Sequence, residues 1–256
     1  MATSMQNKVV LVTGASSGIG KATAIHFALL GSKLVITGRN ESALQETAGA
    51  CKGAVDIVQV VGDLTKESVV EGLMQKTIEH YGQLDVLVNS AGIAKSESIE
   101  TTSLEQYDML MNVNVRSVYH LTMLAVPHLI TTKGAIVNVS SVTGMRAFPG
   151  VLSYCVSKSA IDQFTRCIAL ELAPKQVRVN SVNPGVIVTD IHKRMGQSEE
   201  QYAQFLEHCK TTHALGRVGE AEEVAKSIAF LASSDSSFIT GVQLAIDGGR
   251  HVMCPR

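Results

Sequence analysis

Short runs of aliphatic residues alternate with stretches of helical periodicity along the chain, and this alternation limits the fold more than any other feature. Apolar strands joined by helices predict a parallel sheet covered on both faces, and right-handed crossovers make that sheet doubly wound. We therefore expect one α/β domain over residues 1–256, built on a mostly parallel sheet of seven strands. The strands are expected at 8–14, 33–38, 55–64, 84–92, 134–141, 177–185 and 241–249, and the helices at 20–31, 41–50, 66–81, 104–130, 154–173 and 220–232.

One long segment, residues 190–215, interrupts this alternation. It is polar, with scattered apolar residues that include Met195, Tyr202, Phe205 and Leu206. Interruptions of this length in a compact domain are often lids over a binding site. We expect a substrate lid here, with room for a short helix.

The composition favours a compact enzyme and argues against several other classes of protein. Of the 256 residues, 45% are hydrophobic, and the formal net charge is −1. No block of like charge supports binding to nucleic acid or to an acidic membrane. The sequence shows neither a targeting segment nor an apolar run near the ~20 residues that span a bilayer. We expect a soluble, cytoplasmic protein that acts on a small molecule.

The five cysteines are scattered and show no metal-ligand spacing. The eight histidines do not form a metal-binding pattern either. We expect reduced thiols and no metal site, although Cys155 lies beside Tyr154 and could be reactive.

The stretch TGASSGIG, residues 13–20, follows the first expected strand and opens the first expected helix. In that context Gly14 permits a tight turn, Gly18 lets the backbone approach a phosphate, and Gly20 lets the helix pack closely on the strand. The N–H groups and the dipole at the helix start favour a pyrophosphate. The motif predicts a Rossmann fold that holds a dinucleotide at Gly14, Ser16, Ser17, Gly18, Ile19 and Gly20.

The end of the second expected strand discriminates between the two nicotinamide cofactors. An NAD enzyme usually carries an acid there for the ribose 2′-hydroxyl, whereas this chain has Gly38 followed by Arg39. A guanidinium binds a 2′-phosphate bidentately, and a carboxylate would repel it. We therefore expect NADPH or NADP+ rather than NADH, although Arg39 would also suit a solvated loop.

Two further segments are predicted to meet the cofactor. Asp63 ends the third expected strand and is placed to bind the adenine amino group. The stretch NSAG, residues 89–92, follows the fourth strand, where small residues let the backbone pass close to a ribose. The cofactor contacts expected here are Asp63, Leu64, Asn89, Ala91 and Gly92.

At this point the motifs match a family. TGASSGIG and NSAG, followed by MNVNV, NVSS, YCVSK and PGVIVT, have the order and spacing of the short-chain dehydrogenase/reductase family, which the chain resembles over nearly its whole length. The resemblance implies that Asn114, Ser141, Tyr154 and Lys158 are catalytic, and the spacing to the tyrosine selects Ser141 over Ser140. Ser90 departs from the asparagine or alanine of many members.

The resemblance also implies how the rest of the site is used. Lys158 would bind the nicotinamide ribose, and Asn114 would relay protons from Lys158 to solvent through a bound water. In the segment 184–189, Ile187 would meet the nicotinamide carboxamide and Thr189 would support the phosphates. The expected contacts there are Pro184, Gly185, Ile187 and Thr189, although the segment could also be a simple turn.

Physical chemistry gives a separate reason to single out Tyr154 and Lys158. Four residues apart on a helix, they share a face. A free phenol has a pKa of about 10, and a nearby ammonium stabilises the phenolate. We therefore expect Lys158 to lower the pKa of Tyr154 toward working pH. Ser141 could then hydrogen-bond the substrate oxygen as charge develops on it.

The substrate is less well defined by the sequence. Its walls are expected from Ile93 to Lys95, from Met145, Arg146 and Phe148, and from the lid. The chain most resembles the 3-oxoacyl-acyl-carrier-protein reductase type and eukaryotic carbonyl and hydroxysteroid reductases. These relatives imply a lipid-like, acyl-thioester or alicyclic ketone. Arg146 could meet an anionic group or lie on the surface.

Two other functions remain open at this stage. One is a redox sensor that holds NADPH with little turnover, which the complete tetrad disfavours; the other is a methyltransferase, whose cofactor has no pyrophosphate. The resemblance also implies a homotetramer built on the helices at 104–130 and 154–173 and on the last strand. The apolar stripe of the first helix, which includes Val118, Leu121 and Ala125, could equally be core. The tail 250–256 could reach a neighbouring subunit.

Overall fold

The strands of the computed structural model form one parallel sheet in the order β3-β2-β1-β4-β5-β6-β7. The structure describes residues 5–191, 195–196 and 198–254. The predicted doubly wound α/β fold is confirmed: β2 has its expected bounds, and the other strands are shorter than their expected ranges. The strands are β1 Val9–Thr13, β2 Lys33–Gly38, β3 Asp56–Val61, β4 Val86–Asn89, β5 Ala135–Val139, β6 Arg178–Pro184 and β7 Gln243–Ile246.

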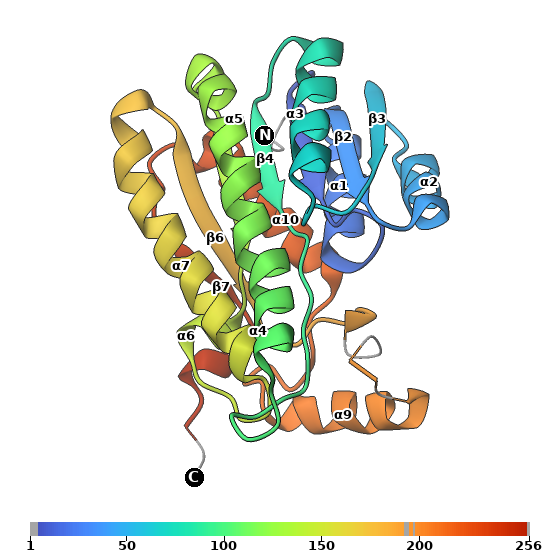
Figure 1. Ribbon diagram of the computed structural model, residues 1–256, viewed down its shortest axis with the longest axis vertical. Coiled ribbons are helices and arrows are strands. Elements are labelled where there is room, and N and C mark those ends of the chain that lie inside the picture. The colour runs from blue at the N-terminus through green and yellow to red at the C-terminus, as the bar shows by residue number, and fades with distance from the viewer. Residues whose placement is uncertain (1–4, 192–194, 197, 255–256) are drawn as a thin grey trace.

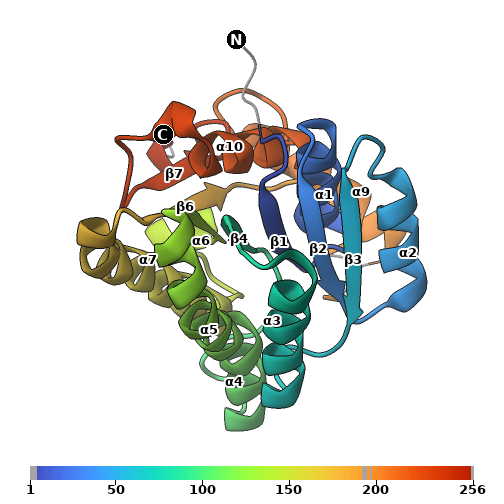
Figure 2. The ribbon, with the colours of Figure 1, turned by 90° about the horizontal axis from the view of Figure 1, so that it is seen from above.

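Helices cover both faces of this sheet. Figure 2 shows α3, α5 and α7 on one side and α1 and α10 on the other. Each layer buries its own apolar cluster against the strands, which is why the strands are apolar on both faces. The helices are α1 Gly18–Leu29, α2 Glu41–Ala50, α3 Glu67–Tyr81, α4 Leu104–Met111, α5 Ser117–Thr132, α6 Val142–Met145, α7 Leu152–Leu172, α9 Glu199–Thr211 and α10 Ala221–Ala232, with short 3-10 turns at Ala173–Lys175, Ser234–Ser236 and Arg250–Val252.

The helix expected at 104–130 is interrupted by a π-helical turn over Asn112–Arg116, which joins α4 to α5. Single π-helical turns inside α-helices are often found at functional sites. After the turn, α5 directs Val118, Leu121 and Ala125 into the interior. The apolar stripe that could have been an interface is therefore core. Tyr119 and Met123 are instead exposed on α5.

Residues 190–215 carry the short helix that the sequence allows, α9. Its start is fixed by a capping box, in which the Ser198 hydroxyl accepts from the Gln201 backbone and the Gln201 side chain accepts from the Ser198 backbone. Figure 1 places α9 beyond the lower ends of the strands, and α6 also lies at that end. Residues 192–194 and 197 of this segment lie outside the described residues.

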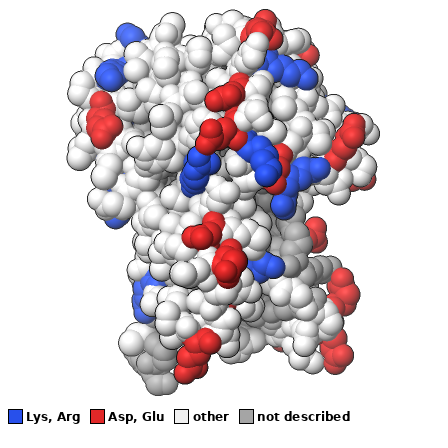
Figure 3. Space-filling model, in the orientation of Figure 1, with Lys and Arg blue, Asp and Glu red and all other residues white. Residues whose placement is uncertain are grey.

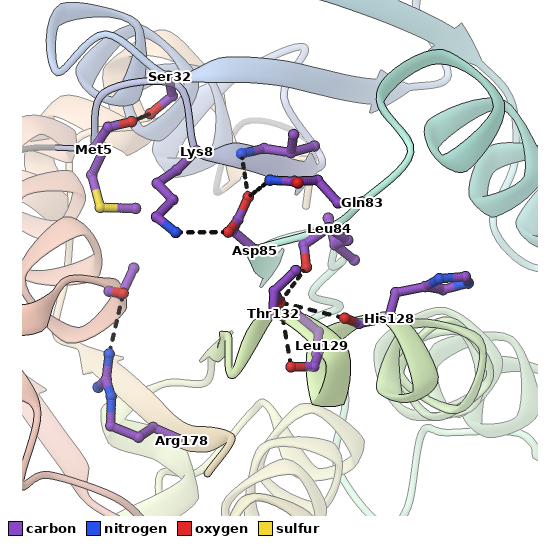
Figure 4. A network of polar contacts seen from close by, with 12 residues as sticks. Met5, Lys8, Ser32, Gln83, Leu84, Asp85, His128, Leu129, Thr132 and Arg178 are labelled. Atoms are coloured by element: carbon purple, nitrogen blue, oxygen red, sulfur yellow. Dashed lines mark hydrogen bonds and ion pairs between the residues drawn. The ribbon is translucent and has the colours of Figure 1, made fainter. Parts of the chain in front are cut away.

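The opposite, amino end of the sheet is held by a network of polar contacts (Figure 4). Asp85 accepts hydrogen bonds from the Lys8 ammonium at 2.9 Å, the Val9 backbone at 2.9 Å and the Gln83 amide at 2.7 Å. Arg178 donates to the carbonyls of residues 231, 232 and 233 and to the Ser236 hydroxyl. These contacts tie β1 to β4 and β6 to the end of α10.

On the face shown in Figure 3, basic and acidic side chains lie next to one another and do not gather by sign. Within the described ranges, no helix has the length and hydropathy needed to cross a membrane.

Candidate active site

A cavity of about 590 Å³ lies at the carboxyl ends of the strands, where doubly wound folds bind their ligands. It brings together segments that are far apart in the sequence. The site residues predicted from sequence that line it are Gly14, Ser16, Ser17, Gly18, Ile19, Gly20, Arg39, Asp63, Leu64, Ala91, Gly92, Ser141, Tyr154, Lys158, Pro184, Gly185, Ile187 and Thr189. Asn89 and Asn114 are not among the lining residues.

The glycines of the 13–20 turn are required by close backbone contacts. Gly14 has a φ of 66°, and a Cβ there would lie 2.9 Å from the Ala91 Cα. A Cβ on Gly20 would lie 2.3 Å from the Gly14 carbonyl oxygen. The turn therefore opens a cradle at the amino end of α1 in which the backbone faces the cavity. Backbone N–H groups at a helix start suit a pyrophosphate, so the residues present fit a dinucleotide.

The end of β2 is closely packed. A Cβ on Gly38 would lie 2.9 Å from the Ser16 hydroxyl oxygen, so a side chain at this position would require Ser16 to move. Arg39 is exposed and lines the cavity. Asp63 accepts hydrogen bonds from the Thr65 backbone at 3.0 Å and from the Thr65 hydroxyl at 2.9 Å. These bonds, with a smaller contribution from Arg39, lower the pKa of Asp63.

Asn89 belongs to the interior of the sheet. Its side-chain amide donates to Asn138 at 2.9 Å and to Thr122 at 3.3 Å, and only 3% of the residue is exposed. The neighbouring backbone N–H groups of Ser90 and Ala91 are both bonded to the Thr13 hydroxyl at 3.0 Å. The side chain of Asn89 therefore fixes the strand, while the residues after it line the cavity.

One part of the cavity brings together three of the predicted catalytic residues, Tyr154, Lys158 and Ser141. Lys158 is buried, and its ammonium donates to the Val139 carbonyl at 2.8 Å and lies 5.5 Å from the centre of the Tyr154 ring. Ser141 lies two residues beyond β5, not at its end, and its hydroxyl accepts from the Thr143 backbone at the start of α6. Helix α7 begins at Leu152, two residues before the tyrosine.

Within the protein alone, the pKa of Tyr154 is shifted in the direction opposite to the one expected from Lys158 and an oxidised nicotinamide together. Burial raises the pKa of the Tyr154 phenol to about 12, and a hydrogen bond with Ser141 only partly opposes this. Burial also lowers the pKa of Lys158 to about 8, partly opposed by Asp162. Removal from water is therefore the largest cause of both shifts.

Asn114 lies in the π-helical turn, behind the cavity wall. Its side-chain oxygen accepts from the Ile93 backbone at 2.9 Å, and its amide donates to the Ile93 carbonyl at 2.9 Å and to the Ser157 hydroxyl at 3.1 Å. The residue is 1% exposed. Asn114 therefore fixes the segment after β4 against α7, next to the turn that carries Tyr154 and Lys158.

Sequence reasoning missed a buried carboxylate under this site. Asp162 accepts two hydrogen bonds from the Asn183 amide, at 3.1 and 2.9 Å, and burial raises its pKa. The same amide donates to the Ser141 carbonyl at 2.9 Å, and the Ser140 hydroxyl donates to the Lys158 carbonyl at 3.2 Å. The position of Asp162, four residues after Lys158 on the same helix face, was the available signal.

The segment 184–189 is joined to α9. The Tyr202 hydroxyl donates to the Thr189 carbonyl at 3.0 Å and accepts from the Thr189 backbone at 3.3 Å. His213 is buried, and its ring accepts from the Val186 backbone at 3.2 Å and contacts the Cys209 carbonyl at 2.7 Å. These contacts attach the predicted lid to the end of β6 at both ends of α9.

The substrate end of the cavity differs in part from the predicted one. Phe148, Met195 and Phe205 line it, as do Ile93 and Ala94. Other predicted residues do not: Lys95, Met145, Arg146, Tyr202 and Leu206 are absent from the lining. Arg146 instead donates to the His251 carbonyl, so the start of the tail packs on its own chain. His208 and Cys209 of the predicted lid line the cavity, and so does Arg250, which was not predicted.

Comparison with known proteins agrees with this site. A family described as enoyl-(acyl-carrier-protein) reductase matches residues 14–251. The 3-oxoacyl-[acyl-carrier-protein] reductase FabG of Thermotoga maritima is 38% identical, over 96% of this chain and 98% of that protein. The chain belongs to the short-chain dehydrogenase/reductase family. It is therefore an oxidoreductase, as the cavity at the strand ends indicates.

Solved structures of the family superimpose closely. A short-chain dehydrogenase/reductase of unknown function from Caenorhabditis elegans, solved with cofactor, has a TM-score of 0.92 at 36% identity and 98% and 97% coverage of the two chains. A 3-ketoacyl-(acyl-carrier-protein) reductase from Brucella melitensis, complexed with NADH, has a TM-score of 0.89 at 33% identity and 97% and 100% coverage. The predicted family and fold are confirmed.

Proposed function

We propose that this protein interconverts a ketone and a secondary alcohol with NADP(H), and that Tyr154 is the acid and base. The observation that carries the proposal is the meeting of Tyr154, Lys158 and Ser141 at one end of a cavity whose other end is the 13–20 cradle. When bound there, the reduced nicotinamide supplies a hydride. The proposed substrate is a lipid-like, acyl-thioester or alicyclic ketone.

In the reductive direction the phenol of Tyr154 gives its proton to the substrate oxygen. A pKa raised to about 12 keeps this proton in place at neutral pH, so the group begins each turnover as an acid. The Ser141 hydroxyl donates to the same oxygen as charge develops on it. The Lys158 ammonium stabilises the phenolate that remains, and Asn114 holds the Ile93 segment for a water-borne proton relay.

The preference for NADPH is supported by the end of β2. Gly38 stands where an NAD enzyme usually carries an acid, and the exposed Arg39 next to it lines the cavity. A 2′-phosphate would meet a cation here and not a carboxylate. Asp63 at the adenine ring, Ile187 at the carboxamide and Thr189 at the phosphates complete the proposed contacts.

The direct test is NADPH oxidation by the purified chain, followed by loss of absorbance with a panel of simple ketones, β-ketoacyl thioesters and steroid ketones. We expect stoichiometric alcohol product with at least one class. Binding of NADPH without turnover of any ketone would favour the alternative of a redox sensor. The presence of the complete tetrad argues against that alternative.

Three further properties belong to the proposal. The segment 190–215 would act as the substrate lid, with Met195 and Phe205 facing the cavity. The protein would work in the cytoplasm. It would form a homotetramer through exposed apolar residues of α5 and α7, among them Tyr119, Met123 and Leu170. Light scattering after gel filtration measures the last property.

A further inference from the structure

Besides Arg39 and Lys158, the cavity is lined by a third basic side chain, Arg250. This residue follows the Gly248–Gly249 turn after β7, and its guanidinium carbon lies 4.9 Å from the centre of the Phe148 ring. Its Nε and Nη1 atoms are enclosed, and they have no hydrogen-bond partner. A guanidinium has no acceptor capacity, and buried donors without acceptors are costly. A ligand with acceptor oxygens would give these donors the hydrogen-bond partners that they lack.

The acids around Arg250 are bonded to other groups. Asp247, three residues earlier, accepts from the His251 ring at 2.8 Å and from the backbones of Gly249 and His251. Of the described residues that line the cavity, the single acid is Asp63, at the adenine end. The nearby side chain that does contact the guanidinium is the uncharged thiol of Cys209. The positive charge of Arg250 is therefore not neutralised within the described part of the chain.

The walls next to Arg250 are apolar. Phe148 stacks on the guanidinium, and Ile191, Met195 and Phe205 line the same cavity. Contact with a ring face holds a guanidinium in place by a cation–π attraction. The low polarity of these walls strengthens a charge-assisted hydrogen bond made there.

We propose that Arg250 binds an oxyanion at one end of the substrate, so that the preferred substrates are ketones that carry a carboxylate or a phosphate on an apolar chain. This inference rests on the proposed reductase function and narrows its substrate class. It also assigns a role to the segment after β7: the turn brings a cation from the end of the chain to the wall opposite the 13–20 cradle.

The test compares matched substrates in the full-length wild-type chain. Straight-chain oxo-acids of increasing length are assayed with NADPH beside their methyl esters and primary amides, and beside oxoalkyl phosphates. We expect kcat/KM for the acid or the phosphate to exceed that of the ester by about tenfold to a hundredfold, the range of one or two hydrogen bonds to a charged group. The phosphate arm distinguishes the two oxyanions.

Variants then assign the preference to this residue. Arg250→Met is expected to abolish the preference for the acid over its ester, and Arg250→Lys to retain part of it. Arg166→Gln, at a surface arginine bonded to Gln163 and Gln243, is the matched control and should keep the full preference. NADPH fluorescence and the unfolding temperature show whether each variant is folded.

The outcomes separate the two proposals. If no ketone of any charge is reduced, the proposed function itself fails. If neutral ketones are reduced as well as the acids and phosphates, the function stands and the oxyanion site does not. A preference that survives in folded Arg250→Met also overturns the site, and Arg250→Gln replaces that variant if it does not fold.

Discussion

Arg178 and Arg250 lie at opposite ends of the sheet and are used in opposite ways. Arg178, at the start of β6 and labelled in Figure 4, donates four hydrogen bonds of 2.7 to 3.1 Å to carbonyl and hydroxyl groups near the end of α10. Arg250, beyond the end of β7, keeps two nitrogens without a partner in the cavity wall. At the amino end of the sheet, the guanidinium of Arg178 is hydrogen-bonded within the protein. At the carboxyl end, the guanidinium of Arg250 keeps donors that we propose a ligand would bind. Buried polar groups that have no hydrogen-bond partner are often found at functional sites.

The largest expected effect is on turnover, at the carboxyl end. Tyr154→Phe removes the proton that the substrate oxygen receives, and kcat/KM should fall about 10³-fold. The phenol is not needed for cofactor binding in this account, so the dissociation constant of NADPH should change little. Steady-state kinetics and a fluorescence titration of NADPH check both statements. Retained activity would show that another group is the acid.

The next effect is on stability and contrasts the two arginines directly. Arg178→Met removes charge-assisted hydrogen bonds and leaves buried carbonyls unpaired, so the free energy of unfolding should drop by roughly 2–3 kcal/mol. Arg250→Met loses the contact with Phe148, worth about 1 kcal/mol or less, but also removes two buried donors that have no partner, so its free energy of unfolding should drop by less than that of Arg178→Met. Urea unfolding of both variants measures the difference. Equal losses would remove the contrast between the two ends.

A third prediction concerns the cofactor end of the same cavity. Arg39→Asp places a carboxylate where the 2′-phosphate is proposed to lie, and the ratio of kcat/KM for NADPH over NADH should fall by about tenfold or more. Because Arg39 is exposed, the unfolding temperature should stay unchanged. Lys52→Asp, at an exposed position in the loop before β3, is the control for charge alone. An unchanged cofactor ratio would show that Arg39 is only a solvated loop residue.

The smallest effect is a pH dependence. The pKa of Lys158 is lowered to about 8 by burial, so its ammonium is present below that pH and lost above it. Reductive kcat/KM for NADPH, which reports on the free enzyme, should therefore decline about tenfold per pH unit above 8. The raised pKa of Tyr154 adds no decline between pH 7 and 9, because the phenol stays protonated there. A flat profile across this interval would contradict the role given to Lys158.

Much of the fold follows from local patterns. Most strands of the sheet are runs rich in aliphatic residues, and the 13–20 glycines mark the first turn because their spacing is local. The capping box at Ser198 and Gln201 is also written in adjacent residues, and it could have given the start of α9. These features need no knowledge of the rest of the chain.

The properties that the sequence did not predict correctly depend on contacts between segments that are far apart in the chain. The pKa of Tyr154 is set by burial under elements that the helix spacing does not show. Asp162 acquires its role only through Asn183 on β6, and Arg250 only through Phe148 on another loop. Arg146 looked equally suitable for an anion, yet its partner is the His251 carbonyl. Sequence position alone could not choose between these two arginines.

The π-helical turn at Asn112–Arg116 has a consequence for engineering this chain. Because an α-helix advances about 100° per residue, one extra residue in the turn sets the phase of everything downstream. Deleting a single residue there would give a more regular helix, yet it would rotate either Asn114 away from Ile93 or the core face of α5 away from the sheet. A variant in which this helix is made regular would therefore lose either the contact that positions the site or the packing of α5 on the sheet.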